Sequence, residues 1–158
     1  MSKSYTEASK NFEQIFEDDM RLFLFEQGID YPFSTPKSSS GRADVISNID
    51  TNDPIIVEIK ILDKKRNYGK NRIKGGFSQI VSYSNDYNKS VGYLVIFNMN
   101  NETINFKLND GTITTTPVIN FNSKVYYVIV IDLVSEKSAS KKGVLQEITV
   151  LESELTRE

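Results

Sequence analysis

Three charged side chains lie inside segments that otherwise have the composition of buried strands. Asp44 follows Gly41-Arg42-Ala43, and Glu58 and Lys60 interrupt the apolar run over residues 55–62. Charged groups are almost never buried without partners, because an unpaired buried charge is costly. Residues two apart on a strand share a face, so a strand would point Glu58 and Lys60 to the same side. This pattern indicates a site that holds a metal ion.

The composition narrows the chemistry that such a site can perform. The 158 residues include no cysteine and no histidine. This excludes disulfides, iron–sulfur clusters, thiolate zinc sites, cysteine nucleophiles and histidine bases. Metal or acid–base chemistry must therefore use carboxylates, lysine, tyrosine, hydroxyls and backbone groups, and ligands that are all oxygen indicate magnesium, manganese or calcium. The net charge of −2 does not by itself indicate a nucleic-acid-binding protein, although a local basic patch could still bind one.

The length and hydropathy of the chain favour a single domain. The N-terminus lacks an apolar signal region, and no apolar run is long enough to span a bilayer. We therefore expect a cytoplasmic location and no membrane partner. No internal repeat or domain boundary is evident, so we expect residues 1–158 to form one domain.

The apolar pattern predicts an alternation of helices and strands. Residues 6–27 carry a helical apolar stripe that ends at a glycine, and residues 42–48 have the pattern of a strand. Residues 55–62 are apolar on both faces, as in a central strand that helices cover. The other expected elements are a basic loop (63–76), a helix (76–88), strands (91–97 and 125–133), a hairpin (103–108 with 112–118, turning at Asn109-Asp110-Gly111), a surface loop (135–143), an edge strand (144–151) and a frayed end. The order predicts an α/β fold with a mixed sheet of about five strands.

The order of these features resembles that of the PD-(D/E)XK nuclease superfamily. The matching elements are Glu17 in the first expected helix, Asp44, and Glu58-Ile59-Lys60. The following helix carries Gln79-Ile80-Val81-Ser82-Tyr83, which is similar to the Gln-X-X-X-Tyr motif of the exonuclease-like and resolvase-like branch. The resemblance covers roughly residues 10–98. It implies a restriction-endonuclease-like core, a mixed β-sheet flanked by helices, with residues 99–158 as a C-terminal β-rich extension.

The resemblance implies a Mg²⁺- or Mn²⁺-dependent nuclease that hydrolyses phosphodiester bonds, with DNA as the favoured substrate. Asp44 and Glu58 would bind the metal, and the backbone carbonyl of Ile59 would be a third ligand. The chemistry of the residues agrees, because a divalent ion held by two carboxylates can activate water and neutralise charge on a phosphate. Lys60 would orient or deprotonate the attacking water, or stabilise charge on the phosphorane. The sequence does not separate these roles of Lys60.

The resemblance also implies supporting roles for Glu17, Gln79 and Tyr83. An acid of the first helix in this family holds a metal-bound water or a second ion, which would be the role of Glu17. The competing acids are Glu13, Asp18 and Asp19, and an acidic solvent face is the alternative for all of them. Gln79 and Tyr83 are four residues apart and share a helical face, which in the family lies beside the metal site. The alternative for Tyr83 is a core aromatic residue with a satisfied hydroxyl.

A basic segment directly follows the expected catalytic strand and would border the site. Its candidate substrate-binding residues are Lys64, Lys65, Arg66, Tyr68, Lys70, Arg72 and Lys74. Cations in such a position can neutralise backbone phosphates, and an aromatic ring can stack on a base. Arg42, near Asp44, is a further candidate. The alternatives are a solvated charged loop and, for Arg42, an ion pair with a carboxylate.

The absence of a zinc finger or a clear helix-turn-helix favours a structure-dependent or weakly sequence-specific nuclease. Such an enzyme could work as a homodimer or within a larger nuclease assembly. The aromatic residues Phe106, Phe121, Tyr126 and Tyr127 are expected mainly in the core, with a partner or dimer interface as the alternative.

Two other functional classes remain open. The main alternative is a non-catalytic nucleic-acid-binding or protein-interaction domain that retains the nuclease fold. A third is an unrelated α/β domain in which Glu58 and Lys60 form a structural ion pair. That alternative predicts that Asp44, Glu58 and Lys60 do not converge on one point.

Overall fold

The computed structural model describes residues 12–27, 37–38, 41–42, 45–47, 55–134 and 146–157. The first helix, α2 (Phe12–Glu26), falls within the expected span of 6–27 and ends just before the glycine stop. In the described part of the chain, no helix is long and apolar enough to cross a membrane. The turn expected before residue 55 and the surface loop expected over 135–143 lie outside the described residues.

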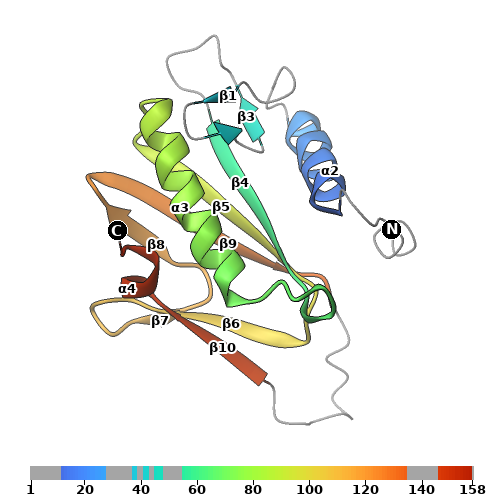
Figure 1. Ribbon diagram of the computed structural model, residues 1–158, viewed down its shortest axis with the longest axis vertical. Helices are drawn as coiled ribbons and strands as arrows, with labels where there is room; N and C mark the ends of the chain where they lie inside the picture. The colour runs from blue at the N-terminus through green and yellow to red at the C-terminus, as the bar shows by residue number, and fades with distance from the viewer. Residues whose placement is uncertain are drawn as a thin grey trace.

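A central sheet of five strands has the order β3-β4-β5-β9-β8 (Figure 1). The strands are β3 (Val45–Ser47), β4 (Ile55–Leu62), β5 (Val91–Asn98), β8 (Val118–Phe121) and β9 (Lys124–Asp132). β4, β5 and β9 run parallel to one another, whereas β3 and β8 pair antiparallel at the two edges. The expected α/β class and mixed sheet are therefore confirmed.

Helices cover both faces of β4, which is why this strand is apolar on both sides. Ile56 and Leu62 pack into the same cluster as Phe77 of the helix α3 (Lys70–Asp86), which connects β4 to β5. Ile59 belongs to a second cluster on the opposite face, together with Phe16 of α2. Neighbouring residues of a strand point to opposite faces, so a strand between two helices needs apolar groups at nearly every position.

The prediction of a loop over 63–76 is wrong in its second half, because α3 begins at Lys70. Glycine is a poor helix former, so Gly75 and Gly76 gave the sequence the pattern of a loop. Gly76 is buried against β4 and β5, where there is no room for a side chain. Tertiary packing therefore overrides the local propensity. The first half contains a short 3₁₀ turn, η1 (Lys64–Arg66), instead of a featureless loop.

A second sheet has the order β10-β6-β7. Its strands are β6 (Glu102–Lys107), β7 (Ile113–Thr114) and β10 (Gln146–Leu151). β6 and β7 form the expected hairpin, with Gly111 at a φ of 89° in the turn. β7 is shorter than expected, because Val118 already begins β8 in the central sheet. A further two-stranded antiparallel sheet joins β1 (Lys37–Ser38) to β2 (Gly41–Arg42).

The prediction of a frayed C-terminus is wrong. β10 pairs in parallel with β6, and the short helix α4 (Glu152–Leu155) follows it. Leu155 is buried in the same core cluster as Phe77, and Glu154 forms ion pairs with the first turns of α3. The end of the chain is thus held by both apolar and ionic contacts, which the sequence alone does not show.

Candidate active site on strand β4

Glu58 and Lys60 form a buried ion pair on the face of β4 that α3 covers. Lys60 Nζ lies 2.6 Å from Glu58 Oε1, and the two side chains are 10% and 1% exposed. The two-residue spacing places both on one side of the strand, between the core positions Ile56 and Leu62 on the same face. The two residues of the ion pair are therefore charged groups within an otherwise apolar contact between α3 and β4.

A glycine on α3 makes room for the lysine. A Cβ atom built on Gly76 would lie 2.7 Å from Lys60 Cγ and 2.8 Å from Leu94 Cδ1, which is too close for a real contact. The helix backbone therefore rests directly on the aliphatic stem of Lys60. This contact fixes the stem between α3 and β5, and the ammonium group extends from it to Glu58.

In the described residues, the pairing of β3 with β4 reaches Val57, the residue before Glu58. Val45 lies opposite Val57, and the register continues from there toward Ser47 and Ile55. Asp44, the other predicted carboxylate ligand, lies outside the described residues. In the described ranges, no group of three or more acidic side chains is arranged to hold a metal ion. Gly41 and Arg42 form β2, and the side chain of Arg42 lies outside the description.

The structure places Glu17 on the helix that covers the opposite face of β4. Phe16, its neighbour on α2, packs into the cluster of Ile59, whereas Glu58 points toward α3. Arg21 Nη2 lies 3.8 Å from Glu17 Oε2. The helix α2 therefore does not bring Glu17 onto the same face as the Glu58–Lys60 pair, and its role at a metal site stays a prediction.

Gln79 and Tyr83 have different environments although they are one helical turn apart. Tyr83 is buried in the core cluster that contains Ile56 and Ile80. Gln79 is exposed on α3. Tyr83 thus has the position of a core aromatic residue, the alternative considered for it, and a contact of either residue with substrate stays a prediction.

Most cations of the basic segment have acidic partners, and all of these partners except Asp63 come from elsewhere in the chain. The pairs are Lys64 with Glu102, Arg66 with Asp63, Lys70 and Lys74 with Glu154, and Arg72 with Glu13. Lys65 is exposed, and in the described part of the chain no acidic side chain pairs with it. A phosphate that bound to the paired cations would have to compete with these carboxylates.

Arg72 and Tyr68 form a cation–π pair next to the start of α3. The guanidinium carbon of Arg72 lies 4.4 Å from the centroid of the Tyr68 ring. Burial lowers the pKa of Arg72 below its ordinary value, but the guanidinium remains charged at neutral pH. One face of the Tyr68 ring is therefore occupied, so a nucleotide base could stack only on the other face or after displacing Arg72.

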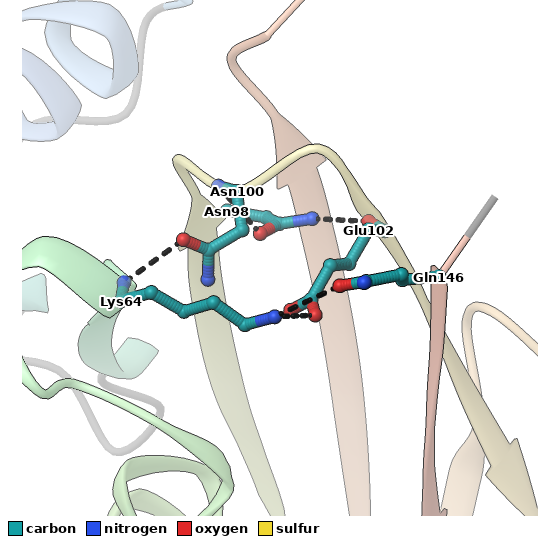
Figure 2. Close-up of polar contacts among 5 residues, drawn as sticks. All are labelled: Lys64, Asn98, Asn100, Glu102 and Gln146. Atoms are coloured by element: carbon teal, nitrogen blue, oxygen red, sulfur yellow. Dashed lines mark hydrogen bonds and ion pairs between the residues drawn. The ribbon is translucent and has the colours of Figure 1, made fainter. Parts of the chain in front are cut away.

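A polar network that the sequence did not single out joins η1 to the central five-stranded sheet and to the sheet of β10, β6 and β7 (Figure 2). Lys64 Nζ pairs with the Glu102 carboxylate and donates to Gln146 Oε1 at 3.1 Å. The backbone N–H of Lys64 donates to Asn100 Oδ1 at 2.9 Å, and Asn98 Nδ2 donates to the Glu102 carbonyl at 2.8 Å. The signal in the sequence is the polar run Asn98–Glu102 directly after an apolar strand. The carboxyl ends of parallel strands are common sites for polar functional groups.

No protein-family model matches this chain, and no curated protein or solved structure matches it either. A function for the chain must therefore be inferred from its own residues and their arrangement.

Proposed function

We propose that this protein is a Mg²⁺- or Mn²⁺-dependent nuclease that hydrolyses phosphodiester bonds in DNA. The observation that carries the proposal is the buried Glu58–Lys60 ion pair on β4, directly after Val57, the partner of Val45 on β3. Removing two charges from water costs several kcal/mol per ion, so apolar residues would serve packing at least as well. A role in chemistry gives a reason to keep both charges at this position.

The arrangement of the surrounding elements supports the PD-(D/E)XK class. β3 pairs antiparallel with β4, α3 follows, and β5 then pairs in parallel with β4. The Glu-X-Lys sequence lies on β4, and the Gln-X-X-X-Tyr sequence lies on the helix that packs over it. These are the positions that the resemblance implies for the two motifs.

The donor groups suit a hard divalent cation. Asp44 immediately precedes Val45, and Val45 lies opposite Val57, the residue before Glu58. This register supports a ligand set of the Asp44 and Glu58 carboxylates and the Ile59 carbonyl, all of them oxygen donors of the kind that Mg²⁺ and Mn²⁺ prefer. When bound, the cation would lower the pKa of a coordinated water and neutralise charge on the scissile phosphate.

Lys60 would orient or deprotonate the attacking water, or stabilise charge on the phosphorane. The aliphatic stem of Lys60 is held beneath Gly76, so only the end of the side chain that carries Nζ can change position. With the metal ion bound, the Glu58 carboxylate would share its charge with the ion and would attract the Lys60 ammonium group less strongly. Lys60 Nζ would then be available to a water molecule or a phosphate oxygen.

The basic segment would contact the DNA backbone. Lys65 is exposed on η1, which follows the carboxyl end of β4. The cations paired with Glu102 and Glu154 could exchange these carboxylates for phosphates. Contacts between cations and phosphates carry no sequence information and weaken as salt is added, so the enzyme would be weakly sequence-specific and its DNA binding salt-dependent.

The test is cleavage of linear, circular, single-stranded and branched DNA with Mg²⁺, with Mn²⁺ and with EDTA. The Glu58→Gln variant keeps the size of the side chain and removes its charge. We expect metal-dependent cutting by the wild type that the variant loses, together with weaker binding of Mn²⁺. Cutting that is unaffected by EDTA or by Glu58→Gln would refute the proposal.

A second candidate is a non-catalytic nucleic-acid-binding domain that retains the fold. The observation that favours it is that Lys60 already neutralises Glu58, as in a purely structural ion pair. This candidate predicts salt-sensitive DNA binding, no cleavage of any substrate, and no effect of Glu58→Gln on Mn²⁺ binding. The same set of experiments therefore separates the two.

A further inference from the structure

A pocket of about 190 Å³ lies between α3, the turn that joins β8 to β9, and the segment that contains α4. Its polar lining residues are Ser78, Ser82, Asn122 and Arg157. Ser78 and Ser82 are four residues apart in α3, so they lie on one face of that helix. None of the residues that we assign to the nuclease site lines this pocket, and the two sites are therefore argued from separate observations.

The elements around the pocket are held in place by contacts with the rest of the fold. Asn122 and Ser123 have φ values of 49° and 61°, as in the tight two-residue turns that join antiparallel strands. Directly after the turn, Lys124 Nζ donates to the Ser84 carbonyl of α3 at 2.9 Å. On the other wall, Leu155 is buried in the main core cluster. A ligand therefore enters a pocket whose walls are already ordered, which lowers the entropic cost of binding.

The four polar side chains of the pocket have donor groups that the fold leaves available. Among the described residues, none of them forms a hydrogen bond or an ion pair with another side chain or with the backbone. The acids of α4 have other partners. Glu152 Oε2 accepts a hydrogen bond from the backbone N–H of Asn109 at 2.6 Å. Glu154 pairs with Lys70 and Lys74. No described carboxylate therefore neutralises the guanidinium group at the pocket.

The polar lining indicates an anionic ligand. A guanidinium group presents its donors in a planar fork that matches a carboxylate. The hydroxyls of Ser78 and Ser82 and the amide of Asn122 can donate to the same anion. No acidic side chain lines the pocket to repel it. An arginine with three neutral donors around it is therefore a suitable site for one carboxylate.

The remaining lining residues are apolar and limit which anions fit. They are Val81, Phe121 and Leu155. An ion with oxygen atoms on every side, such as inorganic phosphate, would press some of them against these side chains, which is unfavourable. A carboxylate that carries an apolar group on its other side satisfies both parts of the lining.

The volume of the pocket limits the size of the ligand. Pockets that hold drug-sized molecules measure ~300–1,000 Å³, and this one is smaller. It corresponds to the space of roughly six water molecules at ~30 Å³ each. We propose that the pocket binds a small monocarboxylate with a single apolar group, about the size of benzoate. The carboxylate pairs with Arg157, and the apolar group packs against Phe121 and Val81.

Titration of the full chain with benzoate, followed by amide NMR spectroscopy, tests the proposal. We expect saturable shifts of the signals of Ser78, Ser82, Asn122 and Arg157. Acetate lacks the apolar group and benzamide lacks the charge, so each should bind at least about tenfold more weakly than benzoate. Inorganic phosphate should also bind more weakly, because it has no apolar part.

Two variants and a matched control connect the binding to this pocket. Arg157→Gln removes the charge, and Ser78→Leu fills part of the pocket from an exposed position of α3. Lys107→Gln is the control, because it removes one positive charge from an exposed position of β6 in the other sheet. Each pocket variant should raise the dissociation constant of benzoate at least about tenfold, and the control should leave it unchanged. Circular dichroism identifies a variant that fails to fold, and the other variant then decides.

Four results would overturn the proposal. They are the absence of a saturable shift with benzoate, shifts centred on another part of the chain, equal binding by the wild type and both folded pocket variants, and binding of phosphate or benzamide as tight as that of benzoate. None of these results depends on DNA cleavage, so the proposal can fail without affecting the proposed nuclease activity, and the reverse also holds.

Discussion

Replacing Gly76 with alanine tests how closely α3 packs over the candidate catalytic lysine. The added Cβ would lie 2.7 Å from Lys60 Cγ and 2.8 Å from Leu94 Cδ1, so the helix or both of these side chains must move. Neither movement is easy. Leu94 is fully buried in the core, and the far end of Lys60 is held by Glu58.

The neighbouring Gly75 provides a matched control for the size of the effect. It lies in the same helix, and a Cβ added there would have nothing within 4 Å. Alanine is better than glycine in a helix by about 1 kcal/mol, and overpacking a core costs about 1–3 kcal/mol. We therefore expect Gly75→Ala to raise the free energy of unfolding by about 1 kcal/mol and Gly76→Ala to lower it by about 1 kcal/mol.

Urea denaturation measures this difference of about 2 kcal/mol between the two variants, which corresponds to roughly 4–8 °C in melting temperature for a chain of this length. If the enzyme proposal is right, Gly76→Ala also loses cleavage activity and Gly75→Ala keeps it. A Gly76→Ala protein as stable as Gly75→Ala would refute the close packing of α3 on Lys60.

Three further predictions concern other parts of the molecule. The hydrogen bond from Lys70 is the largest cause that lowers the pKa of Glu154 from 4.5 to about 2. The stabilising contribution of this carboxylate is therefore complete above pH 4.5 and is lost as the pH falls toward 2. In thermal unfolding across this range, the melting temperature of Glu154→Gln should fall less with acid than that of the wild type. Asn98 is buried and its amide donates to two acceptors at 2.8 Å, so Asn98→Ala should lower the free energy of unfolding by about 2 kcal/mol in urea denaturation, and an unchanged value would contradict its stabilising role. Lys65→Ala should leave stability unchanged but reduce the slope of log affinity for DNA against log salt by about 1 in fluorescence anisotropy; an unchanged slope would exclude Lys65 from the interface.

The sequence predicts those helices and strands that a pattern of neighbouring residues is sufficient to identify. β4 is apolar at nearly every position, and this pattern was sufficient to identify a central strand covered on both faces. The start of α3 was misplaced by six residues, from Lys70 to Gly76, because the reason for a glycine in this helix is its contact with Lys60. The parallel pairing of β10 with β6 joins segments about forty residues apart, and no local pattern encodes such a pairing.

The candidate site was predictable in the same limited sense. The period of a strand places Glu58 and Lys60 on one side, and the structure brings their charged atoms into contact. The acidic partners of the basic segment come from remote positions such as Glu13 and Glu154, so only the folded chain shows that these cations are already paired. The sequence likewise does not show that Tyr127 on β9 is exposed.

Cleavage of DNA by Lys60→Met, compared with Lys89→Met, tests the central claim most directly. Both are buried residues, so each variant removes one lysine charge from a buried position, but Lys60 alone of the two pairs with Glu58. We predict that the wild type and Lys89→Met cut DNA in the presence of Mn²⁺, and that Lys60→Met is at least about a hundredfold slower, as expected for loss of a proton-transfer group. Cleavage by Lys60→Met at the wild-type rate, or the absence of metal-dependent cutting by the folded wild type on every DNA substrate, would contradict the assignment of β4 as a nuclease active site.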